Sequence, residues 1–252
     1  MRQKRKAREL SVAAVSQLTP NMRRVTLHGE DLRGFPDNAS GAYFKLVFPG
    51  DNPDKPILRT YTVAQHRPSS LEIDVDFMLH TNTDGSASGV AATWAAQAQV
   101  GDSMSIFGPG LATFINVDAD WFLLVADMTA LPALTASLAL LPADAKGYIV
   151  IEIVSREDQQ DLQAPDGMEF IWVVNPSPGS DSTILYSAIT GLEWQSGEIA
   201  VWAACEFSSM KKIRHYLKQE KRVKKSHLYV SSYWKKGLQE EEHKIVKKED
   251  AA

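Results

Sequence analysis

The tetrapeptide Arg59-Thr60-Tyr61-Thr62 places three kinds of chemistry on one short segment. In a strand, Arg59 and Tyr61 point to one face, and the two threonines point to the other. An arginine can pair with a phosphate, a tyrosine ring can stack on a planar heterocycle, and a threonine can hydrogen-bond to a ring nitrogen. A flavin nucleotide needs all three. An edge strand with a surface arginine and a packed tyrosine is the alternative interpretation of the tetrapeptide alone.

A second candidate feature lies downstream. Segment 74–80 (DVDFMLH) leads through a glycine-containing loop to the alanine-rich segment 90–99 (VAATWAAQAQ), which favours a helix. The start of a helix offers unpaired N–H groups and a favourable dipole to a pyrophosphate, and Gly89 lets a ligand approach the backbone closely. The alternative is a surface helix that packs Trp94 on the first domain.

The elements that must position these residues differ between the two halves of the chain. Alternating apolar and polar residues predict strands at 23–28, 43–48, 59–63 and 71–80. Residues 121–126 form a continuous apolar run, which is typical of a buried parallel strand. Further strands are predicted at 148–154, 170–174, 199–203 and 227–231, and helices at 129–141, 208–219 and 237–248. We therefore expect an antiparallel β-barrel over residues 1–115, followed by a parallel-sheet α/β domain over residues 116–252.

Composition excludes several classes of protein. The net charge of −4 and the pI near 5.9 do not indicate a nucleic-acid or anionic-membrane partner. The single cysteine, Cys205, excludes an intrachain disulfide and a cysteine-ligated cluster. No two of the six histidines are four residues apart, so we expect no bound metal. The apolar runs are far shorter than the roughly 20 residues of a membrane span, and no apolar stretch follows the basic N-terminus. We expect a cytoplasmic monomer.

Several segments in consistent order resemble one family. RTYT at 59–62, DVDFMLH at 74–80 and TWAAQAQVGDSMSIFGP at 93–109 are similar to the siderophore-interacting flavoproteins of the ferredoxin-reductase superfamily. The similarity continues with LLVADMTALPAL at 123–134, VWAACEFSSMKKIRHYL at 201–217 and HLYVSSYWKKGLQEEEH at 227–243. Together the matches cover nearly the whole chain.

This resemblance implies a fold and a reaction. The barrel would bind FAD, and the α/β domain would be an NAD(P)H-binding-like domain. Electrons would pass from NADH or NADPH, with ferredoxin as another possible donor, to the Fe(III) of a ferric siderophore. The resemblance also implies FAD-contacting positions, which are Arg59, Thr60, Tyr61, Thr62, Asp76, Phe77, Leu79, His80, Gly89, Ala91, Ala92, Thr93, Thr129 and Ala130.

Cys205 and Glu206 follow an apolar strand, near the expected nicotinamide or donor site. Cys205 stands where the family has glycine, although a lone cysteine after such a strand is more often a core residue. Glu206 fits a nicotinamide contact, since α/β sites collect at strand ends, and equally fits an acid at a helix start. Both interpretations of Glu206 stay open at the level of the sequence.

Basic residues suggest where the substrate binds. Lys235 and Lys236 follow the last strand, near the expected meeting point of nicotinamide and flavin, and Lys45 could add to them from the barrel. Anionic ferric chelates would be attracted to such a basic entrance. Segment 211–225 is also rich in lysine and arginine, and it is interpreted either as a solvated face or as a docking surface for ferredoxin.

Three rival functions remain at this point. One is an NAD(P)H-dependent flavin or ferredoxin reductase with another acceptor. The second is a non-catalytic carrier of ferric siderophores, which would leave the RTYT strand and the pyrophosphate helix without a purpose. The third is a structural protein of the same fold. The colour and redox behaviour of the purified protein would separate them.

Overall fold

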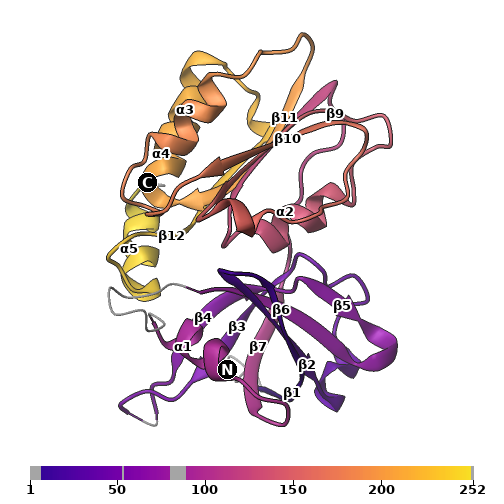
Figure 1. The fold of residues 1–252 in the computed structure, drawn as a ribbon, viewed down its shortest axis with the longest axis vertical. Helices are drawn as coiled ribbons and strands as arrows, with labels where there is room; N and C mark the ends of the chain where they lie inside the picture. The colour runs from indigo at the N-terminus through magenta and orange to yellow at the C-terminus, as the bar shows by residue number, and fades with distance from the viewer. Residues whose placement is uncertain (1–6, 53, 80–88, 251–252) are drawn as a thin grey trace, which may run out of the picture. The chain divides into compact units, whose positions relative to one another are not determined.

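The computed structural model describes residues 7–52, 54–79 and 89–250 of the chain. The chain divides into two compact units, Met1–Thr113 and Phe114–Ala252. Figure 1 shows their strands and helices. Among the described residues, none of the helices is long and apolar enough to cross a membrane.

Within its described residues, the first unit is a seven-stranded sheet in the order β4-β3-β7-β1-β2-β6-β5. The strands are β1 (Arg8–Thr19), β2 (Met22–His28), β3 (Tyr43–Phe48), β4 (Ile57–Thr62), β5 (Gln65–Arg67), β6 (Glu72–Met78) and β7 (Ser103–Gly110). Every pairing between neighbours is antiparallel, as the sequence predicts. Strands β1 and β7 were not predicted, yet β1 occupies the middle of the sheet.

The sheet closes on itself through one continuous segment. Strands β4 and β5 are the two ends of the strand order, but only Val63 and Ala64 separate them along the chain. The backbone N–H of Ala64 donates to the carbonyl of Asp74 at 2.8 Å, so pairing with β6 begins directly after β4. The inward-facing residues are fully buried and include Val25, Phe44, Leu46, Ile73, Val75, Phe77 and Ile106.

Helix α1 (Val90–Gln97) packs on this barrel through Trp94. The Trp94 ring lies 5.7 Å from the ring of Phe77 and 6.2 Å from that of Phe48, measured between centroids. The predicted helix is therefore present, although it ends at Gln97. Its buried face is formed by Ala91, Ala92 and Ala95, whose small side chains let the helix approach the barrel.

The second unit contains a parallel five-stranded sheet among its described residues, in the order β10-β9-β8-β11-β12. Its strands are β8 (Trp121–Asp127), β9 (Lys146–Ile153), β10 (Gly167–Val174), β11 (Ile199–Glu206) and β12 (Leu228–Trp234). Its helices are α2 (Leu131–Leu138), α3 (Ile184–Thr190), α4 (Phe207–His215) and α5 (Glu240–Asp250). The parallel α/β class is the predicted one, whereas α3 was not predicted.

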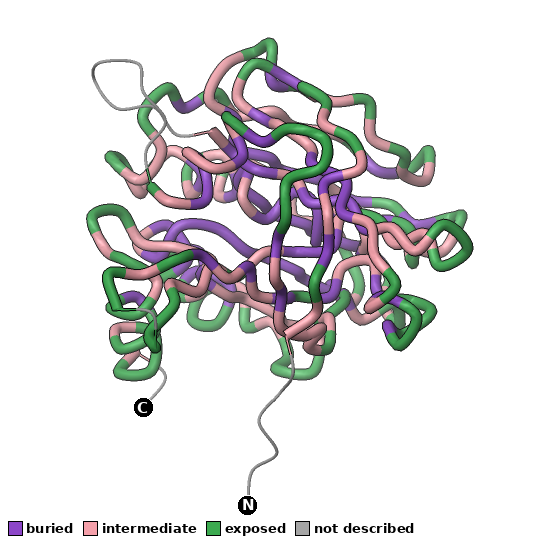
Figure 2. Tube along the Cα trace, turned by 90° about the horizontal axis from the view of Figure 1, so that it is seen from below, coloured by how far each residue is buried: buried purple, intermediate pink, exposed green. Residues whose placement is uncertain are grey.

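Helices cover both faces of this sheet. Figure 1 shows α3 and α4 on one face and α2 on the other. Val125 and Val201 pack against α3 and α4 in one apolar cluster, together with Ile189 and Ile213. Figure 2 shows buried residues concentrated along the strands and exposed residues in the connecting loops.

The strand order reverses between β8 and β11. Strand β9 follows β8 on one side, and the chain later returns to place β11 on the other. In open α/β sheets, ligands bind beyond the carboxyl ends of the strands at such a reversal. Strand β8 ends at Asp127 and β11 ends at Glu206, so these two acids lie at the edge of the sheet where a ligand is expected.

Candidate functional site

The RTYT strand divides its side chains between two faces of the barrel. On the neighbouring strand β3, Tyr61 is paired with Phe44 and Arg59 with Leu46, both of which face the interior. Thr60 and Thr62 are paired with Lys45 and Tyr43 on the outer face. The Lys45 ammonium donates a hydrogen bond to the hydroxyl of Thr60. The alternation expected of a strand is therefore present.

Aromatic rings connect the RTYT strand to helix α1. The half-buried Tyr61 ring lies 4.6 Å from the Phe77 ring at an interplanar angle of 39°. Phe77 in turn contacts Trp94 of α1 at 5.7 Å. Two segments that are about thirty residues apart in the sequence thus lie at one end of the barrel.

The start of α1 is described from Gly89 onward. Gly89 precedes the helix with φ of 84°, and no side chain of the described residues caps it. A Cβ built on Gly89 would meet no described atom within 4 Å. The first N–H groups of a helix have no intrahelical acceptor, so those of Val90, Ala91 and Ala92 can bind an anion. The Thr93 N–H already donates to the carbonyl of Gly89 at 3.0 Å.

The residues at this end of the barrel fit FAD. A guanidinium and an uncapped helix start suit a pyrophosphate, and a half-buried tyrosine ring with exposed surface suits the isoalloxazine. The buried Phe77 supports the Tyr61 ring from behind rather than offering its own surface. Leu79 is partly buried against the same core cluster. His80 lies outside the described residues.

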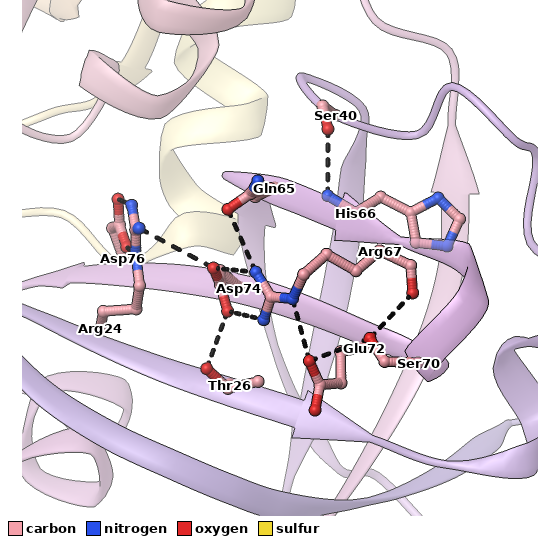
Figure 3. Close-up of polar contacts among 10 residues, drawn as sticks. All are labelled: Arg24, Thr26, Ser40, Gln65, His66, Arg67, Ser70, Glu72, Asp74 and Asp76. Carbon is pink, nitrogen blue, oxygen red and sulfur yellow. Dashed lines mark hydrogen bonds and ion pairs between the residues drawn. The ribbon is translucent and has the colours of Figure 1, made fainter. Parts of the chain in front are cut away.

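Asp76 is engaged in an ion pair on the outer face of the barrel (Figure 3). Arg24 Nε donates to Asp76 Oδ1 at 2.6 Å, and Nη2 donates to Oδ2 at 2.8 Å. Burial raises the pKa of Asp76, while the Arg24 guanidinium opposes this rise. Both carboxylate oxygens already have a strong donor, so Asp76 is a structural ion-pair partner in this arrangement.

A second arginine neutralises the neighbouring Asp74 (Figure 3). Arg67 donates to both Asp74 oxygens at 2.7 and 2.8 Å and to Glu72 at 2.9 Å. Thr26 donates its hydroxyl to Asp74 Oδ1 at 2.8 Å. Burial works against ionisation, but these hydrogen bonds hold the pKa of Asp74 below its usual range. Arg67 is therefore engaged in ion pairs with β6 on the barrel wall.

In the second unit, Thr129 and Ala130 bind the Asp127 carboxylate. The Thr129 N–H and hydroxyl donate to Asp127 Oδ1 at 2.9 and 2.5 Å, and the Ala130 N–H donates at 3.3 Å. Asp127 thereby fixes the turn that leads into α2, whose N-cap residue is Ala130. The other oxygen, Oδ2, accepts from the indole N–H of Trp234 at 2.8 Å. Burial raises the pKa of Asp127 against these hydrogen bonds.

Glu152 lies beside Asp127 on the adjacent strand, as its direct partner in the β8–β9 register. It is buried, and no cation is paired with it among the described residues. Burial and the charge of Asp127 together raise the pKa of Glu152 to about 7. The carboxyl edge of the sheet therefore carries a group that titrates near neutrality.

Cys205 and Glu206 have different surroundings. The Cys205 side chain is 1% exposed and belongs to the core cluster under α3 and α4. Burial, with the charges of nearby carboxylates, raises the pKa of its thiol well above the usual value. Glu206 Oε2 accepts from the backbone N–H groups of Ser208 and Ser209 at 2.5 and 3.2 Å. These two hydrogen bonds support the interpretation of Glu206 as the acid at a helix start.

The predicted substrate lysines of this unit follow β12. Lys235 Nζ lies 4.6 Å from the centroid of the buried Phe207 ring, which is a cation–π contact. Lys236 is exposed, its ammonium donates to the Ser180 hydroxyl, and its backbone N–H donates to Glu206 Oε1 at 3.3 Å. Trp234 and Asp127 were missed by sequence reasoning. An acid that ends an apolar strand is the signal that could have found Asp127.

The comparisons with known proteins cover both units. A family model described as siderophore-interacting FAD-binding domain matches residues 11–56 and 50–113, and one described as siderophore-interacting protein matches residues 119–237. Ferric vibriobactin reductase ViuB from Vibrio cholerae is 35% identical over 243 residues, which cover 89% of this chain and 88% of the relative. The chain belongs to the siderophore-interacting protein family.

Two further relatives of this siderophore-interacting protein add to the comparison. The crystal structure of SipS from Aeromonas hydrophila superposes with a TM-score of 0.85 and 29% identity, over 98% of each chain. An NADPH-dependent ferric-chelate reductase from Escherichia coli is 30% identical over 216 residues, covering 76% of this chain and 82% of the relative. The family, the fold class and FAD as cofactor are thus confirmed.

Proposed function

We propose that this siderophore-interacting protein is an FAD-dependent ferric-siderophore reductase, which reduces chelated Fe(III) to Fe(II) with electrons from NADH or NADPH. Two relatives whose names describe ferric-siderophore or ferric-chelate reductases support the reaction. The observation that supports it is that Tyr61 of the RTYT strand and Trp94 of α1 both contact Phe77, which brings that strand and the helix to the same part of the barrel.

In this proposal the residues bind and orient the cofactor. Arg59 pairs with a phosphate, Ala91 and Ala92 donate backbone N–H groups to the pyrophosphate, and Tyr61 stacks on the ring system. Thr62 approaches the reactive edge of the ring with its backbone or its hydroxyl. Thr129 and Ala130 hold Asp127 in the second unit and so shape the edge that faces the donor.

No side chain of the chain is needed as an acid, base or nucleophile. When bound, FAD supplies the conversion of a two-electron donor into single-electron steps, which is what iron requires. Fe(II) is held less tightly than Fe(III) by hard oxygen ligands, so reduction releases the metal. The protein contributes cofactor binding, exclusion of water and attraction of the anionic chelate by its lysines.

A nicotinamide nucleotide is the proposed donor, and ferredoxin is the alternative. The basic segment considered for ferredoxin docking reaches the amino-terminal edge of the parallel sheet, where Lys224 pairs with Glu198 at 2.7 Å and His227 contacts the Asp118 carbonyl at 2.8 Å. Strand β11 runs from next to Glu198 to Glu206, and eight residues of strand span roughly 25 Å. A protein bound around residues 221–227 would be remote from the edge that carries Glu206, whereas one bound at the other end of segment 211–225 would be near it, because Lys211 Nζ lies 5.7 Å from the centroid of the Phe207 ring. We place the reaction in the cytoplasm, where NADH and NADPH are available.

An anaerobic absorption experiment tests the proposal. The purified protein should show flavin bands that bleach with NADH or NADPH and recover when a ferric siderophore is added, while a ferrous trap develops colour. A protein that FAD cannot reconstitute would overturn it. Recovery of the bands with quinones but not with ferric chelates would favour a reductase with another acceptor.

A further inference from the structure

The chain turns sharply after β12, and this turn is held at three places. Residues 235–238 form the turn, closed by a hydrogen bond from the Leu238 N–H to the Lys235 carbonyl at 3.1 Å. We call residues 234–238 the basic turn. Trp234 reaches Asp127, the Lys236 backbone reaches Glu206, and the Lys235 ammonium rests on Phe207. Since β11 lies between β12 and β8, the Trp234 side chain crosses one whole strand to reach its acceptor.

In both Asp127 and Glu206, the two carboxylate oxygens accept hydrogen bonds from different parts of the chain. Asp127 Oδ1 holds the start of α2 through Thr129 and Ala130, and Oδ2 holds the indole of Trp234. Glu206 Oε2 holds the start of α4, and Oε1 accepts from the Lys236 backbone. Both side chains are about 3% exposed, so water competes weakly for these hydrogen bonds. The position of the basic turn is therefore fixed to two helix starts.

A loop that follows β10 closes against the same turn. Gly179 has φ of 73°, and a Cβ there would come within 3.0 Å of the Trp234 ring and 3.1 Å of Lys236 Cβ. The adjacent Ser180 accepts a hydrogen bond from the Lys236 ammonium. Trp234 and Lys236 are thus packed on one side by a glycine whose lack of a side chain permits the contact.

We propose that Asp127 and Trp234 are positioning residues, whose hydrogen bond across β11 orients Lys235 and Lys236 toward an anionic ferric chelate. The inference rests on the proposed function, because it assigns a purpose to the lysines of that same reaction. Glu206 secures the same turn from the neighbouring strand. Without the bond, Trp234 loses its anchor and the turn samples positions in which the ammonium groups bind a multiply charged anion less well.

Two variants remove this bond in different ways. Trp234→Phe keeps a six-membered ring and deletes the indole N–H. Asp127→Asn keeps one carbonyl oxygen for the start of α2 but presents an NH₂ group, which cannot accept from the indole. Because each variant removes the same hydrogen bond, the double variant should be no worse than the more affected single variant. Trp172→Phe on β10 is the matched control, since Trp172 stacks on Phe170 away from the basic turn.

The readout is steady-state reduction of two ferric chelates of different charge by the FAD-loaded full-length protein. One is the trianionic tris-catecholate complex of Fe(III) with a hexadentate tricatecholamide, and the other is the neutral tris-acetohydroxamate. We expect KM for the trianionic complex to rise about fivefold or more in Trp234→Phe and Asp127→Asn, as befits one lost charge-assisted hydrogen bond. The kcat values, FAD content and KM for the neutral complex should stay within about twofold of the wild type.

The possible outcomes separate the two proposals. A wild-type protein that holds FAD but reduces neither chelate would refute the proposed function. A wild-type protein that reduces both, with an unchanged KM for the trianionic complex in Trp234→Phe, would overturn the positioning role alone. Equal losses for both chelates, or additive losses in the double variant, would also overturn it, because they indicate general damage. Should Asp127→Asn fail to fold, Trp234→Phe with its Trp172→Phe control still decides the question.

Discussion

Arg24 and Asp76 face each other across β2 and β6 and make a two-pronged ion pair, with N–O distances of 2.6 and 2.8 Å. The carboxylate is largely shielded from water, with 8% of its side chain exposed, whereas Arg24 is 30% exposed. The family resemblance implies that Asp76 lines the FAD site. In the structure Arg24 donates to both oxygens of Asp76, so a role in the barrel wall and a role in the FAD site lead to a measurable contrast.

Replacing Arg24 with methionine should destabilise the protein without emptying the flavin site. The change keeps an aliphatic side chain but leaves the shielded Asp76 carboxylate without its donor, so we expect a loss of about 1–3 kcal/mol in the free energy of unfolding. Urea denaturation followed by tryptophan fluorescence measures it. Arg33→Met is the control, because Arg33 and its partner Glu30 are exposed and the variant should show no measurable change. A stable Arg24→Met protein that has lost FAD affinity would indicate that Asp76 contributes to the FAD site.

Replacing Arg59 with alanine should weaken binding of FAD and spare binding of riboflavin. Arg59 is proposed to pair with a phosphate, and riboflavin has none. Loss of a charge-assisted hydrogen bond raises Kd by about ten- to a hundredfold. Titration of the apoprotein with each flavin, followed by quenching of flavin fluorescence, checks both values. Equal weakening for the two flavins would show that Arg59 acts on the ring system or on the fold. Arg33→Ala serves again as the surface control.

Glu152 should make the protein less stable as pH rises through neutrality. Its pKa in the folded state is raised to about 7, above the value of 4.5 for an unperturbed glutamate, mainly because it is buried. A group with a raised folded pKa stabilises below its unfolded value, and that contribution is lost as pH rises through the folded value. The window is therefore about pH 4.5 to 7, with stability falling toward the upper end.

Glu152→Gln removes this titration. A neutral amide avoids the buried charge beside Asp127, so the variant should be more stable than the wild type at pH 8 by on the order of 1–3 kcal/mol, and the difference should vanish near pH 4.5. Urea denaturation at several pH values measures the difference. The exposed Glu157→Gln change on the same segment should leave the pH profile unaltered. A constant difference at all pH values would show that the amide changes packing instead.

Local sequence patterns predicted much of the fold and suggested part of the candidate site. The continuous apolar run at 121–126 and the alternation at 71–79 predicted β8 and β6 because each strand buries one or both faces completely. Strand β1 was missed because Ala13, Ala14 and Ser16 break the alternation, although the strand is held between β7 and β2 by backbone hydrogen bonds.

The candidate site also combines features of local sequence with contacts between distant residues. The predicted roles of Arg59, Tyr61 and the start of α1 rest on residue type and spacing, since each would act through local geometry. The Trp234–Asp127 bond joins residues 107 positions apart, and the ion pair of Asp76 depends on the β2–β6 register. No local pattern encodes either contact. Such long-range polar contacts decide which acids are free for a ligand and which are structural.

The attachment of α5 should weaken in mild acid through His243. This imidazole is 5% exposed, shares a 2.8 Å hydrogen bond with the Ser232 hydroxyl and packs on Phe207. Burial and the nearby Lys247 and Lys235 lower its pKa, against the opposing charges of Glu240 and Glu206. Because the folded pKa lies below 6.5, the stabilising contribution is present above pH 6.5 and is lost as pH falls below that value. The pH dependence of stability that His243 contributes is opposite in sign to that of Glu152. Variants are therefore needed to separate the two contributions.

His243→Gln tests this sign. Glutamine can still hydrogen-bond to Ser232 but does not titrate, so the decline in stability between about pH 6.5 and 5 should become shallower than in the wild type. Hydrogen exchange of the α5 amides at pH 7 and 5 locates the effect, with lower protection factors at pH 5, after correction for the intrinsic exchange rates, expected in the wild type only. The exposed His215→Gln change is the matched control and should keep the wild-type profile. If His243→Gln and the wild type lose stability equally in acid, groups other than His243 cause that loss. Protonation of the imidazole would then have no effect on the packing of α5.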